Sequence, residues 1–339
     1  MTSDAFVTLA EIEAARATIA PTIRPTPVEP SPSLSDLAGV PVRLKLEHHQ
    51  RSGSFKLRGA ANAVARLTPA ERRAGVVAVS TGNHGRGLAR ACAEAGVRCV
   101  VAMSGLVPTN KVEAIRAEGA EVLISGRSQD EAQGAVDALV AQGMTMIPPF
   151  DHRHVIAGQG TLGLEIAEAM PEVATVLVQL SGGGLIAGIA AALEARVPGV
   201  RVIGVSMARG AAMHASLAAG RPVEVEELPS LADSLGGGIG QDNRHTFAMA
   251  KELVDEVVLL SEPEIAAGIR HCYWQERQIV EGSGAVGVGA ILAGKVRLDG
   301  PTMVLVSGGN IDMELHYRIV GGADVDLALE AGRCPPSAS

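Results

Sequence analysis

Short apolar runs recur along the chain, and most of them are followed by an alanine-rich stretch with helical periodicity. The runs occupy residues 75–80, 97–103, 120–125, 174–180, 200–206 and 301–307. Continuous apolar runs of this length are typical of strands buried on both faces of a parallel sheet, and the stretches between them predict connecting helices. We therefore expect an α/β architecture of mostly parallel, doubly wound sheets.

The length of the chain favours more than one core. At 339 residues the chain exceeds what one simple core usually holds, so we expect two α/β domains. The predicted division is a large domain of residues 1–47 plus 149–325, a small domain of residues 48–148, and a tail of residues 326–339. The segment 221–243, with several glycines and prolines, predicts an irregular loop over a site.

Composition excludes several classes of partner. A net charge of −8 and an aromatic content of 2% provide neither a phosphate-neutralising surface nor stacking platforms, so we expect no nucleic acid. No apolar run reaches membrane-spanning length, and the first residues lack a secretory pattern. The four cysteines show no C-x-x-C spacing, which predicts reduced thiols in a cytoplasmic protein.

Three of the predicted strands end in small-residue turns. Ligands bind beyond the carboxyl ends of parallel strands, where glycine lets the backbone approach and helix N-termini present free amides to anions. The turn at residues 181–185, SGGGL, precedes a helix and is a candidate phosphate cradle. No Walker or dinucleotide fingerprint is present, which disfavours a nicotinamide-dependent oxidoreductase.

Lys56 opens a predicted helix that reads KLRGAANAVARL. A helix N-terminus disfavours an ammonium group but suits an amine that must be neutral or an imine. The ordinary alternative is a solvated surface lysine.

Four motifs in order carry a resemblance to a known family. They are SGSFKLRGA at 52–60, STGNHGRGLA at 80–89, SGGGL at 181–185 and SGGN at 307–310. Together they resemble the fold type II pyridoxal-phosphate enzymes, specifically the serine/threonine dehydratase-like family, whose fold is that of the tryptophan synthase β chain. The segment VIAGQGTLGLEI at 155–166 extends the resemblance over nearly the whole chain.

The resemblance implies roles for individual residues. Lys56 would carry pyridoxal 5′-phosphate as a Schiff base and act as the catalytic base that removes the substrate α-proton. Phe55 would pack near the cofactor ring, Asn83 would bind its 3′-oxygen, and Ser307 would face its pyridine nitrogen. The expected phosphate-binding residues are Ser181, Gly182, Gly183, Gly184 and Leu185, and the expected substrate-binding residues are Ser80, Thr81, Gly82, His84 and Arg86.

Departures from the family pattern refine these expectations. Related racemases carry serine where this chain has Thr81, which favours elimination over racemisation. Arg86 stands where dehydratases usually carry glutamine. It is expected either to bind a substrate that has extra negative charge or length, or to form a salt bridge that stabilises its loop. Ser206 and Met207 stand where metal-activated relatives place an acidic ligand, so we expect no metal.

The predicted function is elimination of water by a carbon–oxygen lyase. The segments 231–240, LADSLGGGIG, and 276–287, ERQIVEGSGAVG, resemble the hydroxyectoine-utilisation dehydratases, so the expected substrate is a β-hydroxy amino acid or a hydroxyectoine-derived compound. The alternatives are a serine/threonine ammonia-lyase or 3-hydroxyaspartate dehydratase, and a non-catalytic pyridoxal-phosphate-binding protein. The resemblance also implies a homodimer and no regulatory C-terminal domain.

Overall fold

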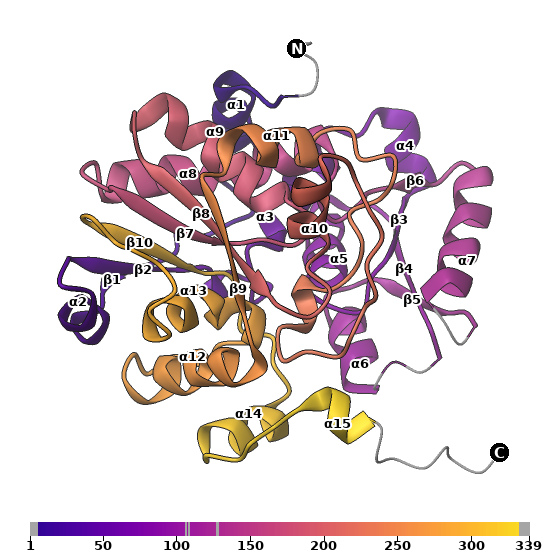
Figure 1. Ribbon diagram of the computed structural model, residues 1–339. Helices are drawn as coiled ribbons and strands as arrows, with labels where there is room; N and C mark the ends of the chain where they lie inside the picture. Colours follow the sequence, from indigo (N-terminus) through magenta and orange to yellow (C-terminus); the bar gives the residue numbers. More distant parts are fainter. Residues whose placement is uncertain (1–5, 106, 108, 127–128, 332–339) are drawn as a thin grey trace.

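The structure is a computed structural model that describes residues 6–105, 107, 109–126 and 129–331. Within these residues the strands form a six-stranded and a four-stranded sheet, which lie side by side with helices around them (Figure 1). Neighbouring strands are parallel except for one antiparallel pair, β1 with β2. The predicted fold class is therefore confirmed.

The six predicted strands are all present, three in each of the two sheets. The six-stranded sheet has the order β1 (Val28–Pro30), β2 (Val42–Leu46), β10 (Thr302–Val306), β7 (Thr175–Gln179), β8 (Arg201–Met207) and β9 (Glu256–Leu260). The four-stranded sheet has the order β5 (Glu121–Ile124), β4 (Cys99–Met103), β3 (Val76–Val79) and β6 (Thr145–Met146).

Strand β2 was missed by the sequence analysis because it does not read as an apolar run. Its sequence VRLKL places Arg43 and Lys45 between apolar residues. Lys45 is nevertheless only 2% exposed, because its ammonium pairs with Glu165 on a helix distant in sequence. An ion pair with a distant residue thus allows a lysine to be buried in this strand, and the pattern of apolar residues in the sequence gives no sign of that pair.

Burial on both sheet faces explains the continuous apolar runs. In β7, Val176 and Val178 join the core on one face, whereas Leu177 joins the core on the other face. The small sheet behaves in the same way, with Val76 of β3 in one cluster and Val77 in another. Successive side chains of a strand point to opposite faces, so the central positions of these strands are apolar on both faces.

Helices cover both faces of the large sheet. On one face α9 contacts β7 and β8, and on the other α13 contacts β7 to β10. The helices α3 and α5 pack together, and α3 also packs on α8. The helices are α1 (Leu9–Ile19), α2 (Pro32–Ala38), α3 (Lys56–Ala65), α4 (Pro69–Ala74), α5 (Asn83–Ala95), α6 (Thr109–Ala117), α7 (Gln129–Ala141), α8 (Arg153–Ala169), α9 (Gly184–Arg196), α10 (Ala212–Ala219), α11 (Thr246–Leu253), α12 (Glu262–Trp274), α13 (Gly282–Leu292), α14 (Met313–Val320) and α15 (Leu327–Ala331), with short 3-10 turns η1 (Glu47–His49) and η2 (Asp233–Leu235).

The segment 221–243 is irregular apart from η2, as predicted. In the part of the chain that the structure describes, no helix is both long and apolar enough to cross a bilayer. The predicted tail contains α15 at residues 327–331, and residues 332–339, with Cys334, lie outside the described residues.

Candidate active site

A cavity lies beyond the carboxyl ends of the central strands of the large sheet, and we call it the inner cavity. It encloses about 490 Å³ of empty space, part of it open to solvent. Seven segments distant in sequence meet here, and they include every predicted cofactor-binding residue. The lining residues are Phe55, Lys56, Asn83, Phe150, Gln179, Ser181, Gly182, Gly183, Gly184, Leu185, Ser234, Leu235, Glu281, Ser283 and Ser307.

Lys56 is the first residue of α3, and its amine is buried in this cavity. Nζ donates a hydrogen bond to the carbonyl oxygen of Pro149 at 2.8 Å and lies 5.3 Å from the centre of the Phe55 ring. Burial lowers the pKa of Lys56 to about 8, because desolvation penalises the charged form. A substantial fraction of this amine is thus neutral near pH 8, which is the state a nucleophile or a base requires.

The loop before Lys56 is held against the loop that follows β10. The backbone N–H of Phe55 donates to the Ser307 carbonyl at 3.0 Å, and Ser54 forms an isolated bridge with Gly308. Gly53 has a φ of +77°, and a Cβ there would lie 2.3 Å from Oδ1 of Asn310. This close approach brings the loop before Lys56 and the loop at Ser307 together, although about 250 residues separate them in sequence.

The turn at 181–185 is a glycine cradle at the start of α9. A Cβ on Gly182 would lie 2.3 Å from the Phe150 ring, and a Cβ on Gly184 would lie 2.8 Å from the Phe150 carbonyl oxygen. Gly183 is the N-cap with a φ of +89°, where a side chain is strained. Because these positions carry no side chains, the backbone amides at the helix N-terminus stay open to an anion.

Buried polar atoms without partners lie around the same cavity. Among the described residues, Oε1 of Gln179 and Oγ of Ser283 are buried and have no hydrogen-bond partner, and both residues line the inner cavity. Buried polar groups are nearly always satisfied, so these atoms indicate a polar ligand. The sequence analysis missed Gln179, Ser283 and Phe150 as site residues, because nothing in their local sequence distinguishes them from core positions.

Asn83 belongs to a hydrogen-bonded chain of three side chains. Its Nδ2 donates to Glu281 at 2.7 Å, and its Oδ1 accepts from Nδ2 of Asn310 at 2.6 Å. Burial, with a smaller contribution from the charge of Asp233, raises the pKa of Glu281 to about 7. Glu281 was quoted in the sequence analysis only as part of a family-like segment, and the structure places it in the cavity wall.

The predicted substrate loop is divided in its contacts. Thr81, Gly82 and Arg86 line a second cavity next to the inner one. The hydroxyl of Ser80 accepts from the N–H of Gly85 at 2.9 Å, which fixes the turn into α5. A ring nitrogen of His84 lies 2.8 Å from the Ile147 carbonyl oxygen, and this residue lines neither cavity. Burial and the nearby charge of Lys56 lower the pKa of His84 to about 3, so this ring stays neutral.

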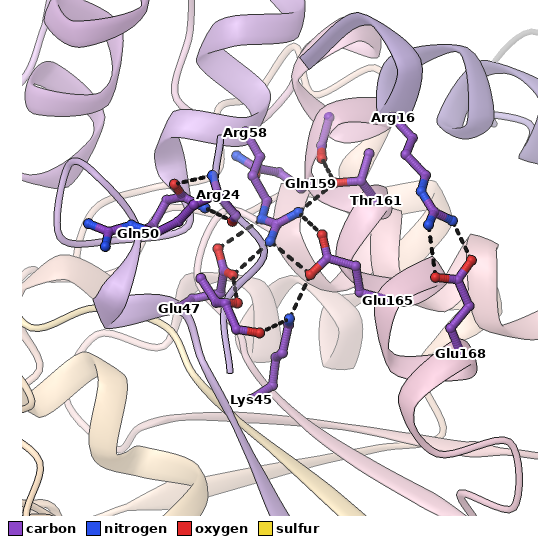
Figure 2. A network of polar contacts seen from close by, with 12 residues as sticks. Arg16, Arg24, Lys45, Glu47, Gln50, Arg58, Gln159, Thr161, Glu165 and Glu168 are labelled. Atoms are coloured by element: carbon purple, nitrogen blue, oxygen red, sulfur yellow. Dashed lines mark hydrogen bonds and ion pairs between the residues drawn. The ribbon is translucent and has the colours of Figure 1, made fainter. Parts of the chain in front are cut away.

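A group of buried charges surrounds Arg58, and we call it the charge cluster (Figure 2). Arg58, two residues after Lys56, donates to Glu47 at 2.8 and 2.9 Å and to Glu165 at 2.5 and 3.0 Å. Lys45 pairs with Glu165 at 2.6 Å. Arg58 and Glu47 have no exposed side-chain surface, so the cluster ties α3 to η1 and α8 from the inside.

No group of three or more His, Cys, Asp or Glu side chains that could hold a metal ion occurs within the described ranges.

Known proteins similar to this chain indicate its family. The profile of the family described as "Pyridoxal-phosphate dependent enzyme" matches residues 19–309. A putative threonine dehydratase of Sinorhizobium fredii is 58% identical over 93% of this chain and 96% of its own length. L-threonine ammonia-lyase of Thermotoga maritima is 40% identical over 93% of this chain and 78% of its own length. The solved structure of maize serine racemase has a TM-score of 0.88 at 31% identity and covers 92% of this chain and 96% of its own.

The chain belongs to the pyridoxal-phosphate dependent enzyme family, with fold type II architecture. Its relatives confirm the predicted cofactor and the predicted class, a pyridoxal-phosphate-dependent lyase of the dehydratase and ammonia-lyase type. The geometry of the site also fits that cofactor, independently of the relatives. The cavity brings together a buried amine, a glycine cradle open to an anion, and buried polar atoms without hydrogen-bond partners.

Proposed function

We propose that the chain eliminates water from a β-hydroxy amino acid and releases a 2-oxo acid and ammonia. One observation carries the proposal: the amine of Lys56, with its pKa lowered to about 8, lies in the same cavity as the glycine cradle at 181–185 and the hydroxyl of Ser307. Support also comes from relatives named as a dehydratase and an ammonia-lyase.

The predicted cofactor-binding residues and part of the predicted substrate loop have tasks in this proposal. When bound, pyridoxal phosphate supplies an aldehyde that amines attack and a ring that withdraws electrons from the substrate α-carbon. Nζ of Lys56 takes the α-proton, and the amides of the cradle hold the phosphate together with Ser181. Asn83 and the neutral hydroxyl of Ser307 orient the ring, with Phe55 packed beside it. The turn at Thr81 and Gly82 receives the substrate carboxylate.

Two finer substrate assignments are open within this reaction. A hydroxyectoine-derived substrate is supported by the segment 231–240, which contributes Ser234 and Leu235 to the inner cavity. Threonine is supported by the names of the relatives. A panel of L-serine, L-threonine, 3-hydroxyaspartate and a hydroxylated diaminobutyrate, with 2-oxo acid and ammonia measured for each, separates them.

The first test removes the amine. Lys56→Ala is expected to keep the fold but to lose at least roughly 10²- to 10⁴-fold in turnover, the usual contribution of a general base. Borohydride treatment of the wild type should fix the cofactor to Lys56 and to no other lysine, as shown by peptide mass mapping. Lys251→Ala, at an exposed position of α11, is the matched control and should keep full activity.

Two outcomes contradict the proposal. Full elimination by Lys56→Ala would remove the base from the mechanism. A wild type that binds the cofactor at Lys56 but releases no 2-oxo acid from any member of the panel would favour the non-catalytic binding protein.

Three further expectations stay predictions. The homodimer is tested by light scattering, the division at residues 48 and 149 by limited proteolysis, and the cytoplasmic location by cell fractionation.

A further inference from the structure

The second cavity opens beside the inner one, and we call it the outer cavity. It encloses about 560 Å³ of empty space, including open solvent. Asn83, Ser234 and Glu281 line both cavities. The outer cavity also includes Thr81 and Gly82, where the proposed function places the substrate carboxylate. The distal end of a bound substrate can therefore reach it.

Most charged groups around the outer cavity already have partners. Lys111 pairs with Asp233 at 3.2 Å. One carboxylate oxygen of Asp312 accepts from Nδ2 of Asn110 at 3.0 Å, and the other accepts from two backbone amides that begin α14, also at 3.0 Å. Glu281 accepts from Asn83. Lys111 and Asp233 therefore compensate each other, whereas Asp312 and Glu281 accept from neutral donors and provide no cation for an anionic ligand.

Arg86 differs from them. Its Nε is buried without a hydrogen-bond partner, and across the described ranges its guanidinium makes no ion pair. Arg90, one helical turn further along α5, shows the ordinary arrangement and pairs with Glu94 at 2.7 Å and with Glu118 at 3.5 Å. Within the described structure, Arg86 therefore does not form the salt bridge that would stabilise its loop. The alternative from the sequence analysis, a contact with a negatively charged substrate group, remains.

A half-buried guanidinium with free donors is suited to one kind of group. Its planar fork matches a carboxylate through two parallel N–H···O bonds. A distal ammonium would be repelled by the same charge at short range. In direct contact, the guanidinium of Arg86 thus favours an anionic distal group and opposes the cationic group of a diaminobutyrate.

We propose that Arg86 selects β-hydroxy amino acids that carry a second carboxylate on the β-carbon, the class of 3-hydroxyaspartate. This inference rests on the proposed function. The reaction is redox-neutral: the Cα–H bond breaks with the proton going to Lys56, the Cβ–O bond breaks with the hydroxyl taking up this proton and leaving as water, and the resulting enamine tautomerises to an imine. Water then hydrolyses the imine, so one four-carbon 2-oxo dicarboxylate and one ammonia form from each substrate.

The test uses the cofactor-loaded enzyme and a pair of non-hydroxylated probes. L-Aspartate and L-asparagine have nearly the same shape, differ in distal charge, and carry no β-hydroxyl to eliminate. Calorimetric titration of the wild type is expected to show tighter binding of aspartate. In Arg86→Gln the ratio of the two dissociation constants should fall by roughly ten- to a hundredfold, the range for a charge-assisted hydrogen bond.

Two matched variants control the measurement. Arg90→Gln removes an arginine of the same helix that already has acidic partners, and it should leave the binding ratio unchanged. Arg86→Lys keeps the charge but loses the fork, so it should recover only part of the preference. Steady-state kinetics with 3-hydroxyaspartate and L-threonine should show the same loss of selectivity in kcat/KM.

Two results would overturn the assignment of Arg86. One is a wild type that binds asparagine as tightly as aspartate, and the other is an Arg86→Gln variant that weakens both probes equally together with a lower Tm. Failure of the proposed function is a separate result: the wild type would show the aspartate preference yet release no 2-oxo acid from any β-hydroxy amino acid.

Discussion

The charge cluster and the outer cavity use the same residue type in opposite ways. Arg58 in the cluster has no exposed side-chain surface and donates to two carboxylates, Glu47 and Glu165. Burial disfavours its charge, but Glu47 and Glu165 outweigh that effect and hold the pKa of Arg58 above its ordinary value. Arg86 on α5 lies in the wall of an open cavity with a buried, unpartnered Nε.

The difference separates structural charge from functional charge. A buried charge is tolerated only when it is paired and hydrogen-bonded, so the cluster satisfies itself within the chain. A charge without a partner gains most when a ligand supplies the counter-charge. The same substitution is therefore expected to lower stability strongly at Arg58 and only slightly at Arg86.

The largest expected effect is on stability at Arg58. Arg58→Met removes the guanidinium and leaves Glu47 fully buried without its ion-pair partner, which should lower the free energy of unfolding by about 3–5 kcal/mol. Arg86→Met breaks no ion pair and should change stability by at most about 1 kcal/mol. Urea unfolding of both variants in the same buffer measures the contrast.

A double substitution checks the cause. Adding Glu47→Gln to Arg58→Met removes the uncompensated charge and should return part of the lost stability, with a coupling of about 0.5–3 kcal/mol. Equal losses for Arg58→Met and Arg86→Met, without any coupling to Glu47, would break the comparison.

A smaller effect, dependent on pH, is expected at Glu281, which lines both cavities. Its folded pKa is raised from 4.5 to about 7 by burial and by the charge of Asp233. Between these values the folded state holds a proton that the unfolded state has lost, so this group makes stability fall as pH rises, and the loss is complete above about pH 7. Each pKa unit corresponds to about 1.4 kcal/mol, which bounds the effect near 3 kcal/mol.

Glu281→Gln should therefore be more stable than the wild type at pH 8, and its advantage should disappear below pH 4.5. Thermal unfolding of the cofactor-free forms across this range measures the difference. A gap that stays constant with pH would show that Glu281 does not carry a raised pKa in the folded chain.

The smallest effect is expected at the paired cation of the outer cavity. Lys111 is 40% exposed and pairs with the more exposed Asp233. Lys111→Met should change the free energy of unfolding by less than about 1 kcal/mol, because surface ion pairs contribute little. A loss above 2 kcal/mol in the same urea series would place Lys111 with the charge cluster instead.

Sequence motifs located the inner cavity, while tertiary contacts defined its remaining wall. Lys56, Asn83, Ser307 and the glycine cradle were all predicted from motif order, and they line one cavity. Gln179 and Phe150 were not predicted, since a glutamine within an apolar strand and a phenylalanine in a loop carry no local signal. They become site residues only because β7 and the segment before α8 end at the same place as the cradle.

Local chemistry along the chain determined the six strands with apolar runs, the helix that begins at Lys56 and the glycine turns. Buried strands need continuous apolar runs, and an anion cradle needs backbone amides without side chains in front of them. The state of the charges was decided only by tertiary structure. Arg58 lies near the start of α3 and Arg86 near the start of α5, and these two helices pack together. Arg58 is paired because Glu47 and Glu165, distant in sequence, lie beside it. Ion pairing and burial are long-range properties, because the partner and the removal of water both come from other parts of the fold.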